Sequence, residues 1–142
     1  MIVENKLIIL SLIALFLAQF LKIPFGYIVT KKIDFNRLFE TGGMPSSHSA
    51  FIVSLTVGIG RTSGFESPIF ALSFVFASIV MYDAMGIRRA AGEHAKLLNL
   101  ILSTDNKFKF DHTKLKELLG HTPFEVLGGI LLGIIVGCFF PL

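Results

Sequence analysis

The chain has 142 residues, of which 53% are hydrophobic and only 16% are charged, and its mean hydropathy is +0.72. Soluble domains carry about a quarter charged residues, so this composition argues against a soluble domain and predicts an integral membrane protein. The length fits one domain over residues 1–142, with no room for an appended soluble module. The net charge of +3 does not indicate nucleic acid, because the basic residues lie between apolar segments, as juxtamembrane charges do.

Five apolar segments follow one another along the chain. The first is long enough to span a bilayer, which takes about 20 residues. No small-residue cleavage site follows it, so we interpret it as a retained helix rather than a signal peptide. The second and fourth are short for full spans, and we expect the fourth to dip into the membrane or lie along its surface. The sequence therefore predicts an all-α membrane bundle of about three to five apolar helices. The segments cover residues 7–29, 49–60, 68–86, 90–102 and 123–140.

The basic residues are unevenly divided between the two sides of such a bundle. If residues 30–48 lie on one side of the membrane, the second apolar segment leads the chain across, so residues 61–67 lie on the other side. The third apolar segment then leads residues 87–121 back to the first side. By the positive-inside rule the first side faces the cytoplasm, and we expect a bacterial-type plasma membrane. That side holds ten of the thirteen basic residues: Lys31, Lys32, Arg37, Arg88, Arg89, Lys96, Lys107, Lys109, Lys114 and Lys116.

The run Gly-Gly-Met-Pro-Ser-Ser-His at residues 42–48 directly precedes the second apolar segment. Pro45 suits the start of a helix, and Ser46 and Ser47 suit its cap. A helix N-terminus offers free backbone N–H groups and a positive dipole end, so it binds phosphate readily. His48 could donate a proton to a leaving oxygen at this place, and the alternative is a surface histidine at a helix start.

His121 and Glu125 form a second candidate pair, since they are four residues apart and therefore one helical turn apart. The carboxylate could accept the Nδ1–H of the imidazole and leave Nε2 free as a nucleophile, which is the general signature of covalent catalysis. The run Thr-Pro-Phe-Glu at 122–125 is also a capping box with proline at the first helical position. We expect the two roles of Glu125 to coexist only if it bonds one partner at a time.

Arg88 and Arg89 follow the third apolar segment and cannot be buried in lipid without a partner. They either face the headgroups or bind an anion, which the planar guanidinium suits well. Arg89 could pair with Glu93 one turn later, which favours Arg88 as the anion ligand. Apart from His121 and Glu125, no histidine and carboxylate stand at a usual ligand spacing, so we expect no metal and no cofactor.

The last apolar segment carries Gly129, Gly133 and Gly137 at four-residue spacing. This spacing puts the glycines on one helix face and permits close helix–helix approach in lipid. The partner helix could belong to the same chain or to a second copy, which would make this face a homo-oligomer contact.

Three motifs together resemble a known family. They are Gly-Gly-Met-Pro-Ser-Ser-His-Ser-Ala at 42–50, Tyr-Asp-Ala-x-Gly-Ile-Arg-Arg-Ala-Ala-Gly at 82–92 and Leu-Gly-His-Thr-Pro-x-Glu-Val at 119–126. In this order they are similar to the divergent branch of the type 2 phosphatidic acid phosphatases (PAP2), which are related to vanadium haloperoxidases. The resemblance runs from about residue 19 to 133. It implies a PAP2-like helical membrane enzyme that removes phosphate from lipid phosphates without a metal.

The resemblance also implies roles for individual residues. His121 matches the histidine that attacks phosphorus, and Glu125 stands where the family has an aspartate that orients this histidine. His48 matches the histidine that protonates the leaving alkoxide. The residues that would hold the phosphate oxygens are Arg88 or Arg89, Ser46 and Ser47, and Lys32 or Arg37.

Two departures from the family pattern keep a second hypothesis open. The family's lysine with a following Arg-Pro is absent, since Leu38 follows Arg37. The family places an arginine shortly before the nucleophilic histidine, whereas Arg88 and Arg89 precede His121 by more than thirty residues. The first hypothesis is a lipid phosphatase that uses a phosphohistidine intermediate and acts on a phospholipid or isoprenoid mono- or diphosphate. The alternative is a catalytically degenerate protein that binds an anionic lipid or a partner helix through the same basic face.

Overall fold

The computed structural model describes residues 4–31, 43–104 and 120–142. They form five helices: α1 (Lys6–Thr30), α2 (Ser47–Ser63), α3 (Pro68–Met85), α4 (Ile87–Thr104) and α5 (Pro123–Phe139). These residues contain no strand, so the prediction of an all-α protein is confirmed. Each predicted apolar segment coincides with one helix.

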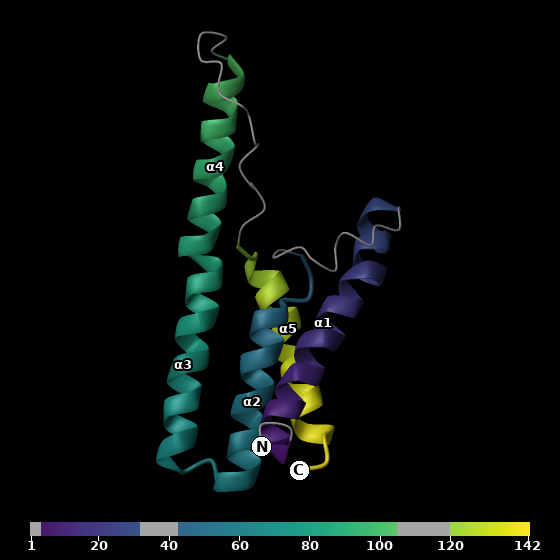
Figure 1. Ribbon diagram of the computed structural model, residues 1–142, viewed down its shortest axis with the longest axis vertical. Coiled ribbons are helices and arrows are strands. Elements are labelled where there is room, and N and C mark those ends of the chain that lie inside the picture. Colours follow the sequence, from purple (N-terminus) through teal and green to yellow (C-terminus); the bar gives the residue numbers. More distant parts are fainter. Residues whose placement is uncertain (1–3, 32–42, 105–119) are drawn as a thin grey trace.

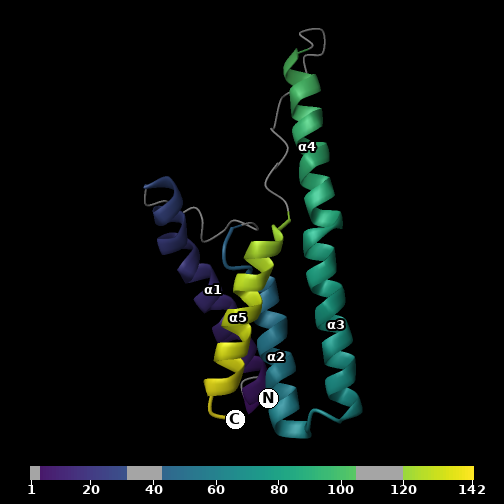
Figure 2. The same ribbon diagram turned by 180° about the vertical axis from the view of Figure 1, so that it is seen from behind.

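The helices alternate in direction along the bundle axis (Figure 1). α1 and α3 run toward one end, and α2 and α5 run back toward the other, where both chain termini lie (Figures 1 and 2). α2 is central, because it packs against α1, α3 and α5. The end of α1, the start of α2, the end of α3 and the start of α5 therefore gather at one end of the bundle, which places the sequence motifs together.

Helix starts coincide with capping residues in the sequence. Each cap side chain accepts a hydrogen bond from a backbone N–H of the first turn, which otherwise has no partner within the helix. Proline at the first helical position of α3 and α5 loses no hydrogen bond there. The caps are Asn5 for α1, Ser46 for α2, Ser67 for α3 and Thr122 for α5.

The glycine stripe of α5 packs against α2 of the same chain. A Cβ atom on Gly133 would lie 2.9 Å from the carbonyl oxygen of Ala50, and one on Gly137 would lie 2.7 Å from Cβ of Val57. Only glycine lets the two backbones come this close, so the predicted close helix approach is confirmed. Since α2 of the same chain covers this buried face, the close approach that the structure shows is an intrachain contact. A homo-oligomer contact through these glycines stays a prediction.

Polar side chains also connect the helices within the bundle. Arg61 Nη1 donates to the carbonyl oxygens of Gly137 at 2.7 Å and Phe140 at 2.8 Å, at the end of α5. A cation at a helix C-terminus satisfies carbonyl groups and opposes the negative end of the dipole. The hydroxyls of Thr56 and Ser73 are hydrogen-bonded at 2.8 Å between α2 and α3. These bonds supplement the packing where lipid provides no hydrophobic force between helices.

α4 continues in the direction of α3 and extends beyond the rest of the bundle (Figures 1 and 2). This differs from our expectation that the fourth segment dips into the membrane or lies along its surface. The reason is that helical hydrogen bonds persist on both sides of Gly86. Its N–H donates to Tyr82 at 2.9 Å, and its carbonyl accepts from Ala90 at 3.0 Å.

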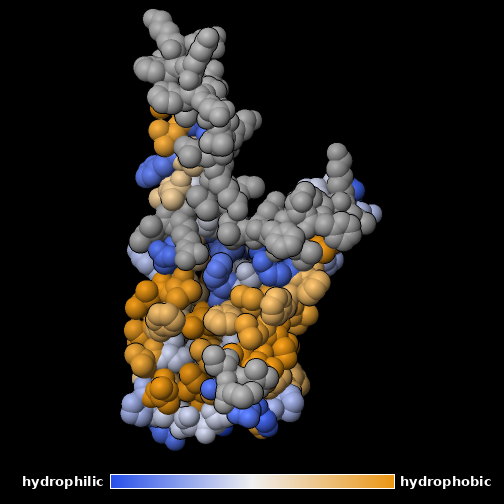
Figure 3. All heavy atoms as spheres, in the orientation of Figure 1, coloured by the Kyte–Doolittle hydropathy of each residue, from blue (hydrophilic) through white to orange (hydrophobic). Residues whose placement is uncertain are grey.

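A hydrophobic band crosses the face of the bundle shown in Figure 3, with hydrophilic residues at its lower edge and in a patch at its upper edge. Large apolar side chains such as Phe20, Leu72 and Leu131 are more than 60% exposed. By length and composition, Lys6–Ile28 and Pro68–Ile101 can cross a membrane, and Pro123–Phe139 is a shorter apolar helix. So wide an apolar surface suits lipid rather than water, so the fold is that of an integral membrane helical bundle.

Neighbouring glycines on α5 allow a matched test of the α2–α5 contact. A methyl group on Gly129 would collide with the carbonyl oxygen of Ser46 and lie 2.8 Å from Cβ of Ser49. A methyl group on Gly128 would meet the flexible end of Met44 at 3.1 Å. We expect Gly129→Ala to destabilise the fold by about 1–3 kcal/mol, as overpacking does.

The control is Gly128→Ala, which we expect to be neutral or stabilising, because the helix propensity of alanine is about 1 kcal/mol more favourable than that of glycine. The measurement is the thermal midpoint in detergent, followed by the helical circular dichroism signal. Equal midpoints for the two variants would contradict the packing described.

Candidate functional site

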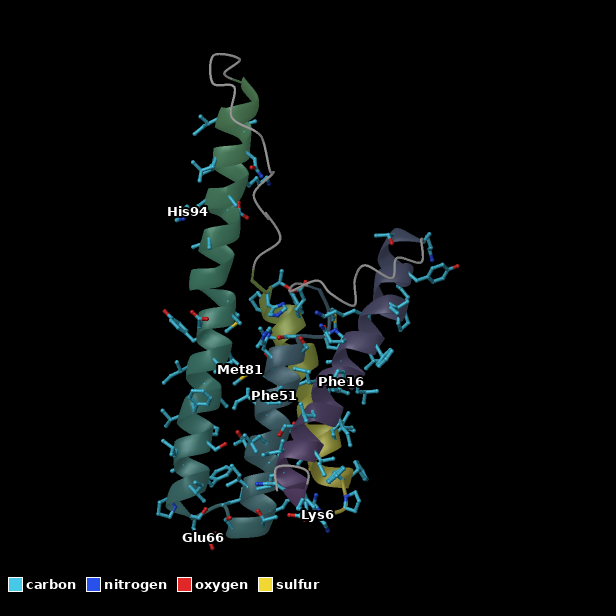
Figure 4. The ribbon with its side chains drawn as sticks, in the orientation of Figure 1. Lys6, Phe16, Phe51, Glu66, Met81 and His94 are labelled. Atoms are coloured by element: carbon cyan, nitrogen blue, oxygen red, sulfur yellow. The ribbon has the colours of Figure 1, made fainter. Side chains whose placement is uncertain are left out.

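Two histidines from distant parts of the sequence meet where α2 and α5 begin. The ring centroids of His48 and His121 are 6.2 Å apart, and the ring planes are inclined by 50°. This separation is comparable with the size of a phosphate group. His121 is only 3% exposed and His48 is partly buried. Side-chain nitrogen and oxygen atoms gather at this end of the bundle, above the labelled side chains of Phe51 and Met81 (Figure 4).

Main-chain hydrogen bonds hold the segments that carry the two histidines. The N–H of His121 donates to the carbonyl oxygen of Ala84 in the last turn of α3, at 3.0 Å. The N–H of Ser46 donates to the carbonyl oxygen of Glu125 in the first turn of α5, at 2.9 Å. The start of α2, the end of α3 and the start of α5 are thus directly linked, so the relative position of the rings does not depend on side-chain packing alone.

Glu125 defines the tautomer of His121. Its Oε2 atom lies 3.3 Å from Nδ1 of the imidazole, and the two side chains are 22% and 2% exposed respectively. An ionised carboxylate can only accept a hydrogen bond, so Nδ1 must carry the proton. In the neutral ring, Nε2 then keeps its lone pair, which is the state that a nucleophile needs.

The same oxygen of Glu125 also completes the cap of α5. Oε2 accepts a hydrogen bond from the N–H of Thr122 at 2.9 Å, and Oγ1 of Thr122 accepts from the N–H of Glu125 at 3.4 Å. The predicted capping box is therefore present. Our expectation that Glu125 bonds one partner at a time was wrong, because one carboxylate oxygen has enough lone-pair sites to contact both donors.

Ser46 and Ser47 are buried, with exposed fractions of 0% and 4%. The hydroxyl of Ser46 accepts from the N–H of Ser49 at 3.3 Å and from its hydroxyl at 3.0 Å, so Ser46 is the cap that the sequence predicts. Ser47 is the first residue of α2 and precedes His48. A phosphate-binding role for either serine stays a prediction.

The predicted cationic ligands are placed only in part. The backbone of Arg88 and Arg89 lies in the first turn of α4, directly after the end of α3, but their side chains are not among those that the structure describes. Lys32 and Arg37 lie outside the described residues. In the described part of the chain, no three His, Cys, Asp or Glu side chains are grouped so that they could hold a metal ion.

Lys22 belongs to this region although our sequence analysis did not include it among the site residues. It lies in α1 and is only 2% exposed. Its Cδ atom would be 3.9 Å from a Cβ atom on Gly43, and its charge acts on Glu125. The sequence did contain one signal, a lysine within an apolar helix, because a charged side chain is costly in a membrane and is usually functional there. The distance in sequence between Lys22 and the three motifs gave no indication of which residues it lies near.

Comparison with known proteins identifies the family. The family model described as the divergent PAP2 family matches residues 3–136. The chain belongs to the divergent PAP2 family. A relative from Bacillus subtilis (strain 168), the "Uncharacterized membrane protein YuiD", is 41% identical, with 98% of each chain covered. No solved structure matches the chain. The resemblance that we inferred from three motifs is thus confirmed, and the match to the PAP2 family model reaches from before α1 to the last turn of α5.

The double contact of Glu125 has a consequence for stability. Glu125→Ala removes the acceptor for both the Thr122 N–H and His121 Nδ1, and we expect a loss of about 1–2 kcal/mol in unfolding free energy. Glu125→Gln retains an amide oxygen that can accept one of the two bonds, so its loss should be smaller. The measurement is again the thermal midpoint in detergent.

The control is Glu93→Ala, which removes an exposed carboxylate from α4 and should leave the midpoint unchanged. An unchanged midpoint for Glu125→Ala would show that Glu125 does not support the start of α5.

Proposed function

We propose that the protein is a membrane-embedded lipid phosphatase that proceeds through a phosphohistidine intermediate on His121. The observation that carries the proposal is the pair of imidazoles 6.2 Å apart, one of which is oriented by a carboxylate. A nucleophile with an orienting group and a second proton-transfer group facing it are the parts that covalent phosphoryl transfer requires. Membership in the divergent PAP2 family supports the assignment.

The surroundings of the site favour an amphiphilic substrate. The histidines lie where α2 and α5 begin, and at this end of the bundle Figure 3 shows a hydrophilic patch beside the hydrophobic band. A substrate whose tail is in the bilayer would present its phosphate at this level. We propose a phospholipid or isoprenoid mono- or diphosphate on this basis. Binding the tail laterally would position the reacting phosphorus without a deep pocket in the protein.

In the first step, the lone pair on Nε2 of His121 attacks phosphorus. The N–P bond forms while the bond from phosphorus to the leaving oxygen breaks. Protonated His48 gives its proton to that oxygen, which leaves as the lipid alcohol, or as the lipid monophosphate when the substrate is a diphosphate. The phosphorylated ring of His121 is cationic, and the carboxylate of Glu125 stabilises it through the Nδ1–H.

In the second step, water hydrolyses the phosphohistidine. Neutral His48 accepts a proton from the water while its oxygen attacks phosphorus, and the P–N bond breaks. Its electron pair returns to Nε2 of His121, so the step restores the neutral nucleophile, protonated His48 and free inorganic phosphate. No group other than water and the substrate is consumed.

Charge stabilisation in both steps requires cations and N–H donors around the phosphate oxygens. We propose Arg88 or Arg89 and the start of α2 at Ser47 for this role, together with Lys32 or Arg37. We further propose that this face of the protein is cytoplasmic and that the membrane is the plasma membrane, because basic residues predominate on this side in the sequence.

The alternative is a protein that binds an anionic lipid at the same face without hydrolysing it. The absence of the family's Arg-Pro motif favours this alternative, since one phosphate ligand is then missing. Both proposals predict lipid-phosphate binding, so only turnover and the covalent intermediate distinguish them.

Replacement of the nucleophile is the direct test of the enzyme proposal. We expect purified protein in detergent to release phosphate from at least one lipid phosphate without added metal and in the presence of a chelator. His121→Ala should abolish the release, because no N–P bond can form. The measurement is inorganic phosphate released from a panel of phospholipid and isoprenoid phosphates.

The control is His94→Ala, since His94 is exposed on α4 well away from the site (Figure 4). Phosphate release that persists in His121→Ala would refute the nucleophile assignment. Lipid-phosphate binding with no release by the wild-type protein on any substrate would favour the non-catalytic alternative.

His48 should show the behaviour of a general acid. We expect His48→Ala to reduce kcat by about 10²–10⁴-fold on a lipid phosphate with an alcohol leaving group. The defect in formation of the phosphohistidine should be much smaller on a lipid-like nitrophenyl phosphate, because nitrophenolate leaves without a proton. The measurement is single-turnover release of the leaving group. Equal defects on the two substrates would contradict the role.

A further inference from the structure

α4 exposes its apolar side and covers the side that carries small residues. Leu97 and Ile101 on the apolar side are 57% and 62% exposed, whereas Gly92 and Ala95 on the other side are buried. A helix that packs only within its own chain buries its apolar side instead. We call the exposed set the α4 stripe. It consists of five exposed residues at helical spacing: Ala90, His94, Leu97, Leu98 and Ile101.

The other helices of the chain do not cover the α4 stripe. Among the described helices, α4 contacts α3 alone. Helical hydrogen bonds persist on both sides of Gly86, and residues 18 apart in a continuous helix lie on one face, because they are five turns apart. Leu97 therefore shares a face with Ile79, which is 59% exposed on α3. α2 packs against another face of α3, where Ala77 is buried. In agreement, His94 points away from α1, α2 and α5 (Figure 4).

Lipid tails do not cover the α4 stripe either. α3 and α4 extend over Pro68–Thr104, which corresponds to about 55 Å of helix, whereas the hydrocarbon core is about 30 Å thick. α4 extends past the starts of α2 and α5 and past the hydrophobic band (Figures 1 and 3). The exposed charges of Glu93 and Lys96 on the same turns would be costly within hydrocarbon. A contiguous apolar surface outside the bilayer core marks a contact with another protein.

We propose that the α4 stripe is the contact surface of a homodimer, in which the stripes of two copies pack against each other. Copies inserted into one membrane in the same orientation have parallel α4 helices. A twofold axis along the membrane normal then places each residue of the stripe beside its counterpart. Positions 90, 94, 97 and 101 are separated by four, three and four residues, the heptad spacing of parallel coiled coils. The interface does not depend on phosphatase activity.

The charges of α4 are complementary in such a pair. Glu93 borders the stripe next to His94, so each Glu93 carboxylate lies beside the imidazole of the other copy and can accept a hydrogen bond from it. Lys96 is about 100° around the helix from Leu97, on the side away from the stripe, so the two lysines do not meet. A polar residue within an apolar coiled-coil contact also fixes the register of the two helices. This combination favours a second copy over an unrelated apolar partner.

The test is crosslinking of the full-length protein in native membranes. Cys138 is the only cysteine of the chain and is exposed, so Cys138→Ser is introduced first. Leu97→Cys or Ile101→Cys is then added, and the membranes are treated with a short bismaleimide that joins two thiols. We expect a product of twice the chain mass from each variant, because the twofold axis places the two thiols side by side.

Lys96→Cys is the matched control, since its side chain is also exposed on α4 but lies away from the stripe. We expect it to give no more dimer than the Cys138→Ser protein. Equal crosslinking of Lys96→Cys and Leu97→Cys would overturn the proposal, because it would indicate random collision. Absence of a dimer from both Leu97→Cys and Ile101→Cys would overturn it as well, and so would a product in which the chain is joined only to a different protein.

A disrupting variant tests whether the stripe itself holds the dimer. We expect Leu97→Lys to abolish the crosslink at Ile101→Cys, because pairing would bury two ammonium groups against each other. The thermal midpoint in detergent should stay unchanged, since Leu97 is exposed in the single chain. An undiminished crosslink in folded Leu97→Lys would overturn the proposal.

Nanodiscs that hold one copy distinguish a second copy from the membrane surface. A polarity-sensitive fluorophore on Leu98→Cys, in the Cys138→Ser protein, should report an aqueous environment in single-copy discs. Its emission should shift to the blue in liposomes reconstituted at high protein density, where copies meet. A blue-shifted emission already in single-copy discs would overturn the proposal, because the bilayer surface or the chain itself would then cover the stripe.

Discussion

The close packing of α5 on α2 is the constraint on which the candidate site depends. Gly129 lies against Ser49, Gly133 against Val53 and Gly137 against Val57, so the two parallel helices keep one register over their length. A side chain at any of these glycines would separate the helices or shift them along their axes. The register sets the start of α5 beside the start of α2, and this juxtaposition brings His121 close to His48.

The site also shows how a membrane bundle can hold charged groups near its apolar interior. Glu125 satisfies a helix N-terminus and contacts a histidine at the same time. Each of these interactions offsets part of the cost of removing its charge from water. A carboxylate bound by the Thr122 N–H and by His121 Nδ1 is held in one orientation, so the imidazole that it binds is held as well. Stability of the α5 start and orientation of His121 therefore depend on one side chain.

Sequence patterns predicted the helices well because each pattern has a local cause. Capping residues and prolines mark the starts of α2, α3 and α5, and their effects extend over only one turn. The direction of α4 was not predictable from its length, because it depends on whether hydrogen bonding continues through Gly86. Lys22 was missed because its position near Gly43 arises only when α1 packs beside α2. The pairing of His48 with His121 came from family resemblance, and spacing alone would not have given it.

Arg88 and Arg89 are far from His121 in the sequence, but the fold brings the start of α4 near the segment that carries His121. We counted this separation as a departure from the family pattern, in which arginine and histidine are close neighbours along the chain. In the structure, the N–H of His121 binds the carbonyl of Ala84, and Arg88 follows Ala84 by four residues, across Gly86 at the junction of α3 and α4. Four residues of chain reach at most about 14 Å, so the backbone of Arg88 lies no farther than this from Ala84. A tertiary contact between α3 and the start of α5 can therefore supply the proximity that a shorter sequence spacing provides elsewhere in the family.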